Sequence, residues 1–342
     1  MRGVGVSSSP LIFIASKYKF IKKILVIRFS SIGDIVLTSP VIRVLKNQLN
    51  AEIHFVSKGP FKSIMEFNPH IAKTWVYSKE DNRLIQNLKD EKFDLVLDLQ
   101  KNISSKKICS SLAIKNISFD KKNVKKWFYV NFKYPPLNIP HLVDRYFEAT
   151  SELGIKNDGK GLEFHIDPSI ENSTKEKDYL CIALGAAHQT KQIPISILSQ
   201  ICEQVKMKVY LLGGQGDAAK GKELASQFDH VHNVAGTCSL QQSAAILRDS
   251  KLLLTGDTGL MHMAVGLSIP TLVLWGNTTP EFGMYPYYGD EKVYSFNHEV
   301  KNLSCRPCSK LGKTSCPKGH FKCMKNQNIE LIVEQIRSFI DV

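Results

Sequence analysis

A carboxylate, a hydroxyl, a glycine and an imidazole lie close together in the stretch Lys251 to Pro280, which reads KLLLTGDTGLMHMAVGLSIPTLVLWGNTTP. Asp257, Thr258, Gly259 and His262 follow a short apolar run. In a helix starting here, Thr258 and His262 would lie one turn apart on a shared face. The free N–H groups of a helix start attract phosphate. The pattern favours an anion-binding site, although a capped helix with a packed histidine would give the same pattern.

The elements that position these residues are a strand, a turn, a helix and a second strand. Leu252 to Leu254 and Thr271 to Trp275 are continuous apolar runs, typical of strands buried on both faces. Asp257 or Thr258 is expected to be the N-cap of the helix between them. Open α/β sheets bind ligands at the carboxyl ends of their strands, where this turn would lie.

A second candidate is the turn RFSSIGDIVLTSP, from Arg28 to Pro40. It lacks the G-x-G-x-x-G pattern, which disfavours a nicotinamide dinucleotide site. Ser31, Gly33 and Thr38 are predicted to form a substrate-access turn, in which the glycine allows close approach. Asp34 would accept a proton from the substrate. Alternatively, Asp34 only caps the helix and Thr38 is merely helical.

Two further turns follow apolar strands in the second half of the chain. GAAHQTKQIP places Lys191 at the opening of a helix, where it can neutralise a phosphate; an exposed lysine without a role is the alternative. LLGGQGD, which ends at Asp217, has glycines that permit a tight backbone near a ligand. Glycine-rich turns are frequent in α/β proteins, so this signal is weak by itself.

Strands and helices alternate along the whole chain, which predicts doubly wound parallel sheets. Among the predicted helices are 35–48, 141–153, 240–248 and 329–340, the last of which is expected to dock back onto the first domain. The predicted division is an extension 1–20, an N-terminal domain 21–166, a linker 167–178, a C-terminal domain 179–328 and a C-terminal helix 329–342. Two such α/β halves would face a central cleft, a common place for ligands.

The composition favours acidic partners. The chain has 342 residues, 43% of them hydrophobic, and a formal net charge of +13, which suits nucleotides, nucleic acid or an anionic membrane surface. Lysines alternate with aromatic residues between Lys101 and Lys133, as at an anionic interface, although a solvated lysine face fits equally. No apolar run approaches the length of a membrane span, and no signal peptide is evident, so the expected compartment is the cytoplasm.

Four cysteines cluster near the C-terminus, at Cys305, Cys308, Cys316 and Cys323. The first pair has metal-knuckle spacing, and the second pair is wider than in a standard zinc ribbon. A structural zinc site, a reduced structural loop and disulfides are the alternatives.

Taken together, these motifs resemble glycosyltransferase family 9, the ADP-heptose:lipopolysaccharide heptosyltransferases. The resemblance runs from about residue 22 to the C-terminus and is carried by RFSSIGDIVLTSP, TKQIP, LLGGQGD, GDTGLMHMAVGLSIPTLVLWG and CRPC…CPKGHFKCM. It implies the GT-B architecture, with two Rossmann-like domains, the nucleotide sugar held mainly by the second and the acceptor by the first. One departure is Ile193, where the family often has tryptophan.

The resemblance also implies roles for individual residues. Asp34 matches the catalytic base, and Lys191 matches the lysine that contacts the donor phosphates. Asp217 is the candidate for the acidic residue that holds the donor ribose, and Glu223 is the alternative. The donor-binding D-T-G-x-x-H corresponds to Asp257, Thr258, Gly259 and His262.

The expected function is therefore inverting transfer of heptose or a related sugar from a nucleotide diphosphate sugar, ADP-heptose being the favoured donor, to the lipopolysaccharide core. No D-x-D dyad lies at a strand end, so no catalytic metal is predicted. The enzyme would work on the cytoplasmic face of the inner membrane, in peripheral contact with anionic lipid. The alternatives are a GT-B nucleotide-sugar epimerase and a basic nucleic-acid-binding protein with a cysteine metal site.

Overall fold

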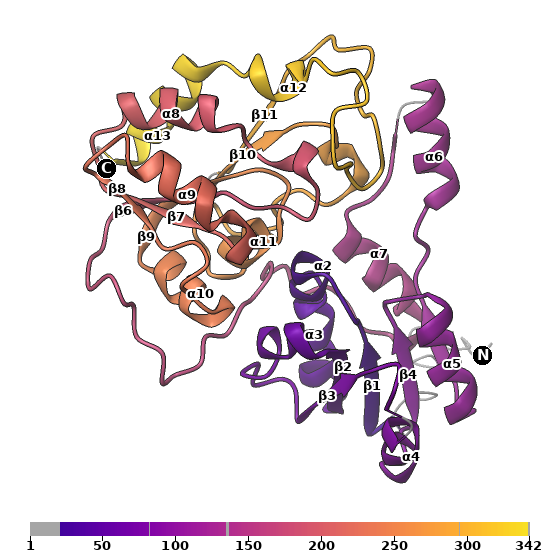
Figure 1. The fold of residues 1–342 in the computed structure, drawn as a ribbon. Coiled ribbons are helices and arrows are strands. Elements are labelled where there is room, and N and C mark those ends of the chain that lie inside the picture. The colour runs from indigo at the N-terminus through magenta and orange to yellow at the C-terminus, as the bar shows by residue number, and fades with distance from the viewer. Residues whose placement is uncertain (1–20, 82, 135–136, 294, 341–342) are drawn as a thin grey trace, which may run out of the picture. The chain divides into compact units, whose positions relative to one another are not determined.

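The computed structural model describes residues 21–81, 83–134, 137–293 and 295–340, so the predicted extension 1–20 lies outside the described residues. The chain divides into two compact units, each built around a parallel sheet (Figure 1). Of the described residues, the first unit contains those within 21–30, 38–120 and 142–158, and the second contains those within 31–37, 121–141 and 159–340. Segments 121–141 and 159–166 therefore group with the second unit, whereas the sequence assigns them to the N-terminal domain.

The first unit has five parallel strands in the order β3-β2-β1-β4-β5, which is the predicted doubly wound arrangement. The strands are β1 (Lys23–Ile27), β2 (Glu52–Lys58), β3 (Lys73–Tyr77), β4 (Leu95–Asp98) and β5 (Asn116–Ser118). The helices are α3 (Ser39–Leu49), α4 (Arg83–Asp90), α5 (Ile103–Leu112) and α7 (Leu142–Ala149), with 3₁₀ turns at Gly59–Ile64 and Ser151–Leu153. Aliphatic side chains of β1 and β4 pack with Leu84 and Leu88 of α4 in its core.

The second unit has six parallel strands in the order β11-β10-β9-β6-β7-β8. The strands are β6 (Tyr179–Ala183), β7 (Val209–Leu212), β8 (Val231–Asn233), β9 (Ser250–Thr255), β10 (Thr271–Trp275) and β11 (Ser295–Glu299). The α-helices are α2 (Ile32–Val36), α6 (Asn123–Phe132), α8 (Ile195–Gln204), α9 (Ala218–Ala225), α10 (Leu240–Arg248), α11 (Gly259–Gly266), α12 (Lys322–Lys325) and α13 (Ile329–Ile340), with 3₁₀ turns at Gln189–Lys191, Gln215–Asp217 and Pro280–Phe282. Because the strands are parallel, the turns after β6, β7, β9 and β10 all leave one edge of the sheet.

The single helix predicted over 35–48 is wrong, because the chain forms α2 and then α3. Thr38 is the N-cap of α3, and Pro40 lies in its first turn. In a first turn the missing N–H of proline removes no helical hydrogen bond, whereas in the interior of a longer helix proline would break the backbone hydrogen bonding. The helix predicted over 141–153 also ends early, at Ala149. A 3₁₀ turn then leads to Gly154, whose φ of 72° is that of a left-handed C-cap.

The C-terminal helix α13 packs within the second unit, not on the first domain as the sequence suggests. Ile332, Val333 and Ile336 are buried in the core of the second sheet. Figure 1 shows α13 beside α8, with which it makes contact. The periodicity correctly predicts the apolar stripe, but it does not specify which surface the stripe covers. Across the residues that the structure describes, no helix has the length and apolarity needed to span a membrane.

Candidate active site

The turn between β9 and α11 presents the start of a helix at the carboxyl edge of the second sheet. Thr258 is the N-cap, with φ −135° and ψ 168°, and its Oγ1 accepts a hydrogen bond of 3.3 Å from the Met261 amide. The Thr255 hydroxyl lies 3.0 Å from the Thr258 hydroxyl and fixes its position. Of the two N-cap residues that the sequence allows, Thr258 takes that place, which leaves the Asp257 carboxylate for another partner.

Asp257 forms an ion pair with Lys191. Asp257 Oδ2 lies 2.7 Å from Lys191 Nζ, and the two side chains are only 11% and 15% exposed. The same carboxylate oxygen accepts a hydrogen bond of 2.9 Å from the Thr278 hydroxyl. The turn carrying Lys191 also packs on the end of β9, since a Cβ on Gly256 would lie 2.2 Å from the Lys191 carbonyl oxygen. The structure therefore brings together two predicted site residues that are 66 positions apart in the sequence.

Helix α2 packs against the N-terminal half of α11. A Cβ on Gly33 would lie 2.4 Å from His262 Cδ2, and one on Gly259 would lie 2.6 Å from Ile32 Cβ. Both glycines are therefore needed for the close approach of the two helices. Asp34 Oδ2 accepts hydrogen bonds from the Ser31 hydroxyl, at 2.8 Å, and from the Ser31 amide, at 3.2 Å. Asp34 is thus held in the same compact unit as Lys191 and Asp257.

His262 is buried where α2 meets α11, and its imidazole is neutral at neutral pH. Its side chain is 2% exposed, and burial lowers its pKa to about 4. The carboxylates of Asp257 and Asp34 oppose this shift, and Lys191 adds to it. Among the described residues Nδ1 has no hydrogen-bond partner, and such a buried polar atom is costly unless something binds it. At neutral pH His262 can serve a ligand as an uncharged hydrogen-bonding group.

Comparison with known proteins decides the family. The family model described as "Glycosyltransferase family 9 (heptosyltransferase)" matches residues 82–314, which is more than half of the chain. The chain belongs to glycosyltransferase family 9. It is 25% identical over 290 residues to lipopolysaccharide heptosyltransferase 1 of Campylobacter coli, covering 75% of this chain and 84% of that protein.

Solved structures of similar proteins agree with the fold of this family 9 chain. A family 9 glycosyltransferase from Veillonella parvula aligns with a TM-score of 0.72 at 20% identity, covering 93% of this chain and 97% of that one. The ADP-heptose lps heptosyltransferase II of E. coli aligns with a TM-score of 0.72 at 17% identity, covering 93% and 98%. The two parallel-sheet units thus have the predicted GT-B fold. A glycosyltransferase is confirmed, and the epimerase and nucleic-acid-binding alternatives are not favoured.

Asp217 of this glycosyltransferase lies in the turn after β7, where its carboxylate has a clear local role. Asp217 Oδ2 accepts a hydrogen bond of 2.9 Å from the Gly214 amide. A Cβ on Gly185 would lie 2.1 Å from the same oxygen, and one on Gly213 would lie 2.8 Å from Asp217 Cβ. The two glycine turns thus enclose the side chain. Its assignment to the donor ribose stays a prediction.

The predicted substrate-access turn is divided between the two units. Ser31 and Gly33 belong to the second unit, whereas Thr38 belongs to the first and is fully buried as the N-cap of α3. Because Thr38 is buried, the structure does not support direct contact between Thr38 and a substrate.

The four cysteines of the C-terminal segment form no disulfide in the structure. Burial, reinforced by nearby Cys305, raises the pKa of Cys308 to about 11, and burial raises that of Cys323 to about 11. Cys305 Sγ lies 3.9 Å from His320 Nε2. Zinc would require these thiols to lose their protons. The assignment of zinc to Cys305, Cys308, Cys316 and Cys323 stays a prediction, which metal analysis of the purified protein can test.

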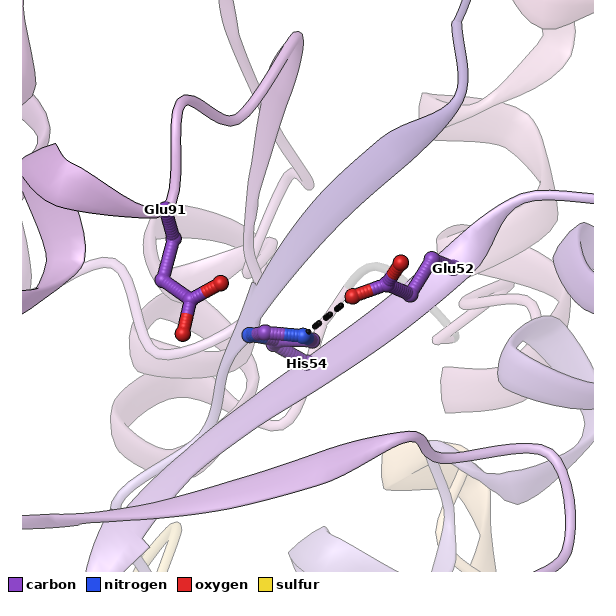
Figure 2. Close-up of side chains that lie close together, drawn as sticks. All are labelled: Glu52, His54 and Glu91. Carbon is purple, nitrogen blue, oxygen red and sulfur yellow. Dashed lines mark hydrogen bonds and ion pairs between the residues drawn. The ribbon is translucent and has the colours of Figure 1, made fainter.

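A second group of potential metal ligands lies in the first unit, where Figure 2 shows His54 between Glu52 and Glu91. His54 Nε2 lies 2.8 Å from Glu52 Oε1, and Nδ1 accepts a hydrogen bond of 3.1 Å from Trp75. Both ring nitrogens are therefore engaged. Lysines neutralise the carboxylates, with Lys23 Nζ 3.1 Å from Glu52 and 2.6 Å from Glu91, and Lys73 Nζ 2.8 Å from Glu91. The group is an ion-pair network in which the lysine ammonium groups, and not a metal ion, neutralise the carboxylates.

Two residues that hold the candidate site together are not among those that the sequence predicts. Thr278 binds Asp257, and Arg306 contacts the turn that carries Thr278. The signal that could have found Thr278 is its position in the sequence NTTP directly after β10, at the same edge of the sheet as the other candidates. Arg306 lies between Cys305 and Cys308, in a motif whose spacing indicates only a role for the thiols.

Proposed function

We propose that this chain transfers heptose, with inversion, from ADP-heptose to the lipopolysaccharide core. The observation that carries the proposal is the packing of α2 on α11, which groups the Asp34 carboxylate with the Lys191–Asp257 pair and the start of α11. The donor is supported by the similarity to the ADP-heptose lps heptosyltransferase II of E. coli, and the acceptor by the similarity to the lipopolysaccharide heptosyltransferase of Campylobacter coli.

In the proposed reaction, Asp34 acts as the general base. An acceptor hydroxyl gives its proton to the Asp34 carboxylate while its oxygen forms a bond to the anomeric carbon of the donor. The bond from that carbon to the diphosphate breaks on the opposite face, so the configuration inverts. The hydrogen bonds from Ser31 to Oδ2 orient the carboxylate for this proton transfer.

The leaving nucleoside diphosphate carries the negative charge that develops. Lys191 would stabilise it as a point charge, and the amides of Thr258 and Gly259 would add the partial positive charge of the helix start. Asp257 would keep Lys191 in place, and neutral His262 would donate or accept a hydrogen bond without changing the net charge. These groups supply the stabilisation that a metal gives in other glycosyltransferases, so none is proposed for catalysis.

The test is release of nucleoside diphosphate from a panel of ADP-, UDP- and GDP-sugars, with and without a lipopolysaccharide acceptor. We expect release from ADP-heptose only when the acceptor is present. Equal release of nucleoside diphosphate without an acceptor would indicate a hydrolase, and conversion of the donor to an isomeric nucleotide sugar without such release would indicate an epimerase. Absence of turnover with every donor would refute the proposal.

We also propose that α6 attaches the enzyme to anionic lipid on the cytoplasmic face of the inner membrane. Its large exposed hydrophobic residues fall at helical spacing along one stripe, at Val124, Trp127, Phe128 and Phe132. The three rings contact one another, with the Trp127 centroid 5.2 Å from that of Phe128 and 5.9 Å from that of Phe132. The aromatic residues would enter the interface, and exposed Lys125 would meet acidic headgroups.

The opposite stripe of α6 is anchored to the second unit. Lys126 is buried and its Nζ lies 5.7 Å from the Phe282 ring centroid. Lys133, directly after the helix, donates to the Pro307 carbonyl. One stripe of α6 thus contacts the rest of the second unit, and the exposed aromatic stripe is the part that would bind the membrane.

A further inference from the structure

Arg306 connects the cysteine segment to the second sheet through its guanidinium group. Its side chain is 9% exposed. Nε donates to the Gly276 carbonyl at 2.6 Å, and Nη2 donates to the Thr278 carbonyl at 2.8 Å. Nη2 also lies 2.6 Å from Glu299 Oε1, and Nη1 donates to the Val300 carbonyl at 3.3 Å. Glu299 therefore balances the charge of the guanidinium group, and the N–H groups of Arg306 bind backbone carbonyl oxygens.

The backbone that Arg306 holds is the turn after β10, which leads directly to the donor residues. The Thr278 hydroxyl donates to Asp257 Oδ2 at 2.9 Å, and that oxygen lies 2.7 Å from Lys191 Nζ. A continuous set of contacts thus runs from Arg306 through Thr278 and Asp257 to Lys191.

The rest of the segment contacts the same two turns. The Cys308 amide donates to the Asn277 carbonyl at 3.0 Å, between the two carbonyls that Arg306 holds. At the turn of Lys191, the Thr190 hydroxyl accepts from the Lys313 amide at 2.8 Å, and the Thr190 amide donates to the Lys313 carbonyl at 3.1 Å. The segment therefore connects the turn that carries Lys191 to the turn that supports Asp257.

We propose that Arg306 is a positioning residue for the diphosphate of the donor. By fixing the Gly276 and Thr278 carbonyls it fixes the Thr278 hydroxyl, which orients Asp257 and, through it, Lys191. Arginine suits this role because its planar fork presents several donors in a fixed geometry, which a lysine cannot do. The inference rests on the proposed function, because it assumes that Lys191 and Asp257 bind the donor.

The experiment compares Arg306→Gln and Arg306→Lys with Arg337→Gln, a control that removes an exposed arginine of the same unit, which donates to the Gln204 carbonyl on the surface. ADP binding is measured by titration calorimetry, and the KM for donor and acceptor by ADP release. We expect Arg306→Gln and Arg306→Lys to weaken ADP binding and raise the donor KM about tenfold, as for loss of well-placed hydrogen bonds. The acceptor KM should change less than twofold, and Arg337→Gln should match the wild type.

A second pair of variants keeps the proposal testable if Arg306→Gln does not fold. Thr278→Val should raise the donor KM to a similar extent, and Thr278→Ser, which retains the hydroxyl, should restore it. In the double variant Arg306→Lys/Thr278→Val the two effects should not add, because both act through Asp257.

Unchanged donor affinity in Arg306→Lys, additive effects in the double variant, or equal rises in the donor and acceptor KM would each overturn the inference while leaving the proposed function intact. A wild-type enzyme that neither binds ADP nor releases it from any donor would refute the proposed function, and the inference with it.

Discussion

Asp34 is the residue on which the proposed reaction depends. Replacing it with asparagine removes the proton acceptor and preserves the side-chain shape. We expect Asp34→Asn to lower kcat by about 10² to 10⁴, the usual contribution of a general base. ADP binding, measured by calorimetry, should stay within about twofold, because Lys191 and the start of α11 are unchanged. Asp90→Asn, on the exposed end of α4, is the control; a similar kcat in both variants would remove Asp34 from the mechanism.

His262 makes stability depend on pH in a defined direction. Its pKa of about 4 in the folded chain lies below the ordinary 6.5, so the unfolded chain binds the proton more readily. The stabilising effect is complete above about pH 6.5 and is lost as the pH falls towards 4. The difference corresponds to at most about 3 kcal/mol.

The corresponding measurement is denaturant unfolding between pH 7 and pH 4. We expect the wild type to lose more stability over this range than His262→Asn, which cannot be protonated. Other groups, among them His54 and Glu91, also have lowered pKa values and will contribute to both curves, so the comparison uses the difference between the two proteins. Parallel curves would contradict the prediction.

For individual residues, the sequence predicts which side chains belong to the candidate site, but it does not predict which of them contact one another. Lys191 and Asp257 are both predicted, each from its own strand-end motif, but the ion pair between them is not. Thr278 and Arg306 could not be found in this way, because their contribution depends on which turns lie side by side, and a spacing along the chain does not record that.

At the level of elements, the close packing of α2 on α11 depends on two glycines. Gly33→Ala would place a methyl group 2.4 Å from His262 Cδ2, which is too close for two carbon atoms. We expect a loss of about 1–3 kcal/mol in the free energy of unfolding, as in overpacked cores, because the imidazole or one of the helices must shift, together with a lower kcat/KM because Asp34 follows directly in α2. The control is Gly59→Ala in the other unit, whose added Cβ would lie 3.7 Å from Val76 Cγ1, an ordinary contact distance. Chemical denaturation and initial rates give the two readouts; wild-type behaviour of Gly33→Ala would show that the contact is loose.

Element boundaries are predictable where a capping signal is local. The helix 240–248 and the strand 271–275 are predicted with the bounds that the structure has, since serine at the N-cap and proline before the strand mark them. The single helix predicted over 35–48 misses the break between α2 and α3, although Pro40 indicates it. The docking of α13 could not be predicted, because its stripe of isoleucine and valine fits any apolar groove.

For the molecule as a whole, the net charge of +13 and the aromatic stripe of α6 together predict membrane attachment. We expect co-sedimentation with vesicles rich in phosphatidylglycerol and little with phosphatidylcholine vesicles, and less binding at high salt. The variant Trp127→Ser/Phe128→Ser/Phe132→Ser should lose most of this binding and retain activity on a detergent-solubilised acceptor.

The matched control is Ile103→Ser, which removes an exposed apolar side chain from α5 in the other unit. Equal loss of binding in both variants would indicate nonspecific adhesion. Binding that persists in the triple variant would show that α6 is not the attachment surface.

The GT-B fold is predictable for the whole chain, because alternation of strands and helices and several strand-end motifs agree with one another. Membership of the units is harder to predict. Residues 31–37 and 121–141 are distant in the chain from the rest of the second unit, and only tertiary packing joins them to it.

The membership of α2 has a consequence for recombining this enzyme with its relatives. A chimera joined at residues 167–178, the linker that the sequence predicts, would take α2 from one parent and α11 from the other, so Ile32 and Gly33 would meet a foreign Gly259 and His262. Crossovers that exchange residues 31–37 along with the C-terminal half keep these partners together. The residues that form the candidate site therefore come from two separate parts of the gene, and we expect these four positions to change together as the family diverges.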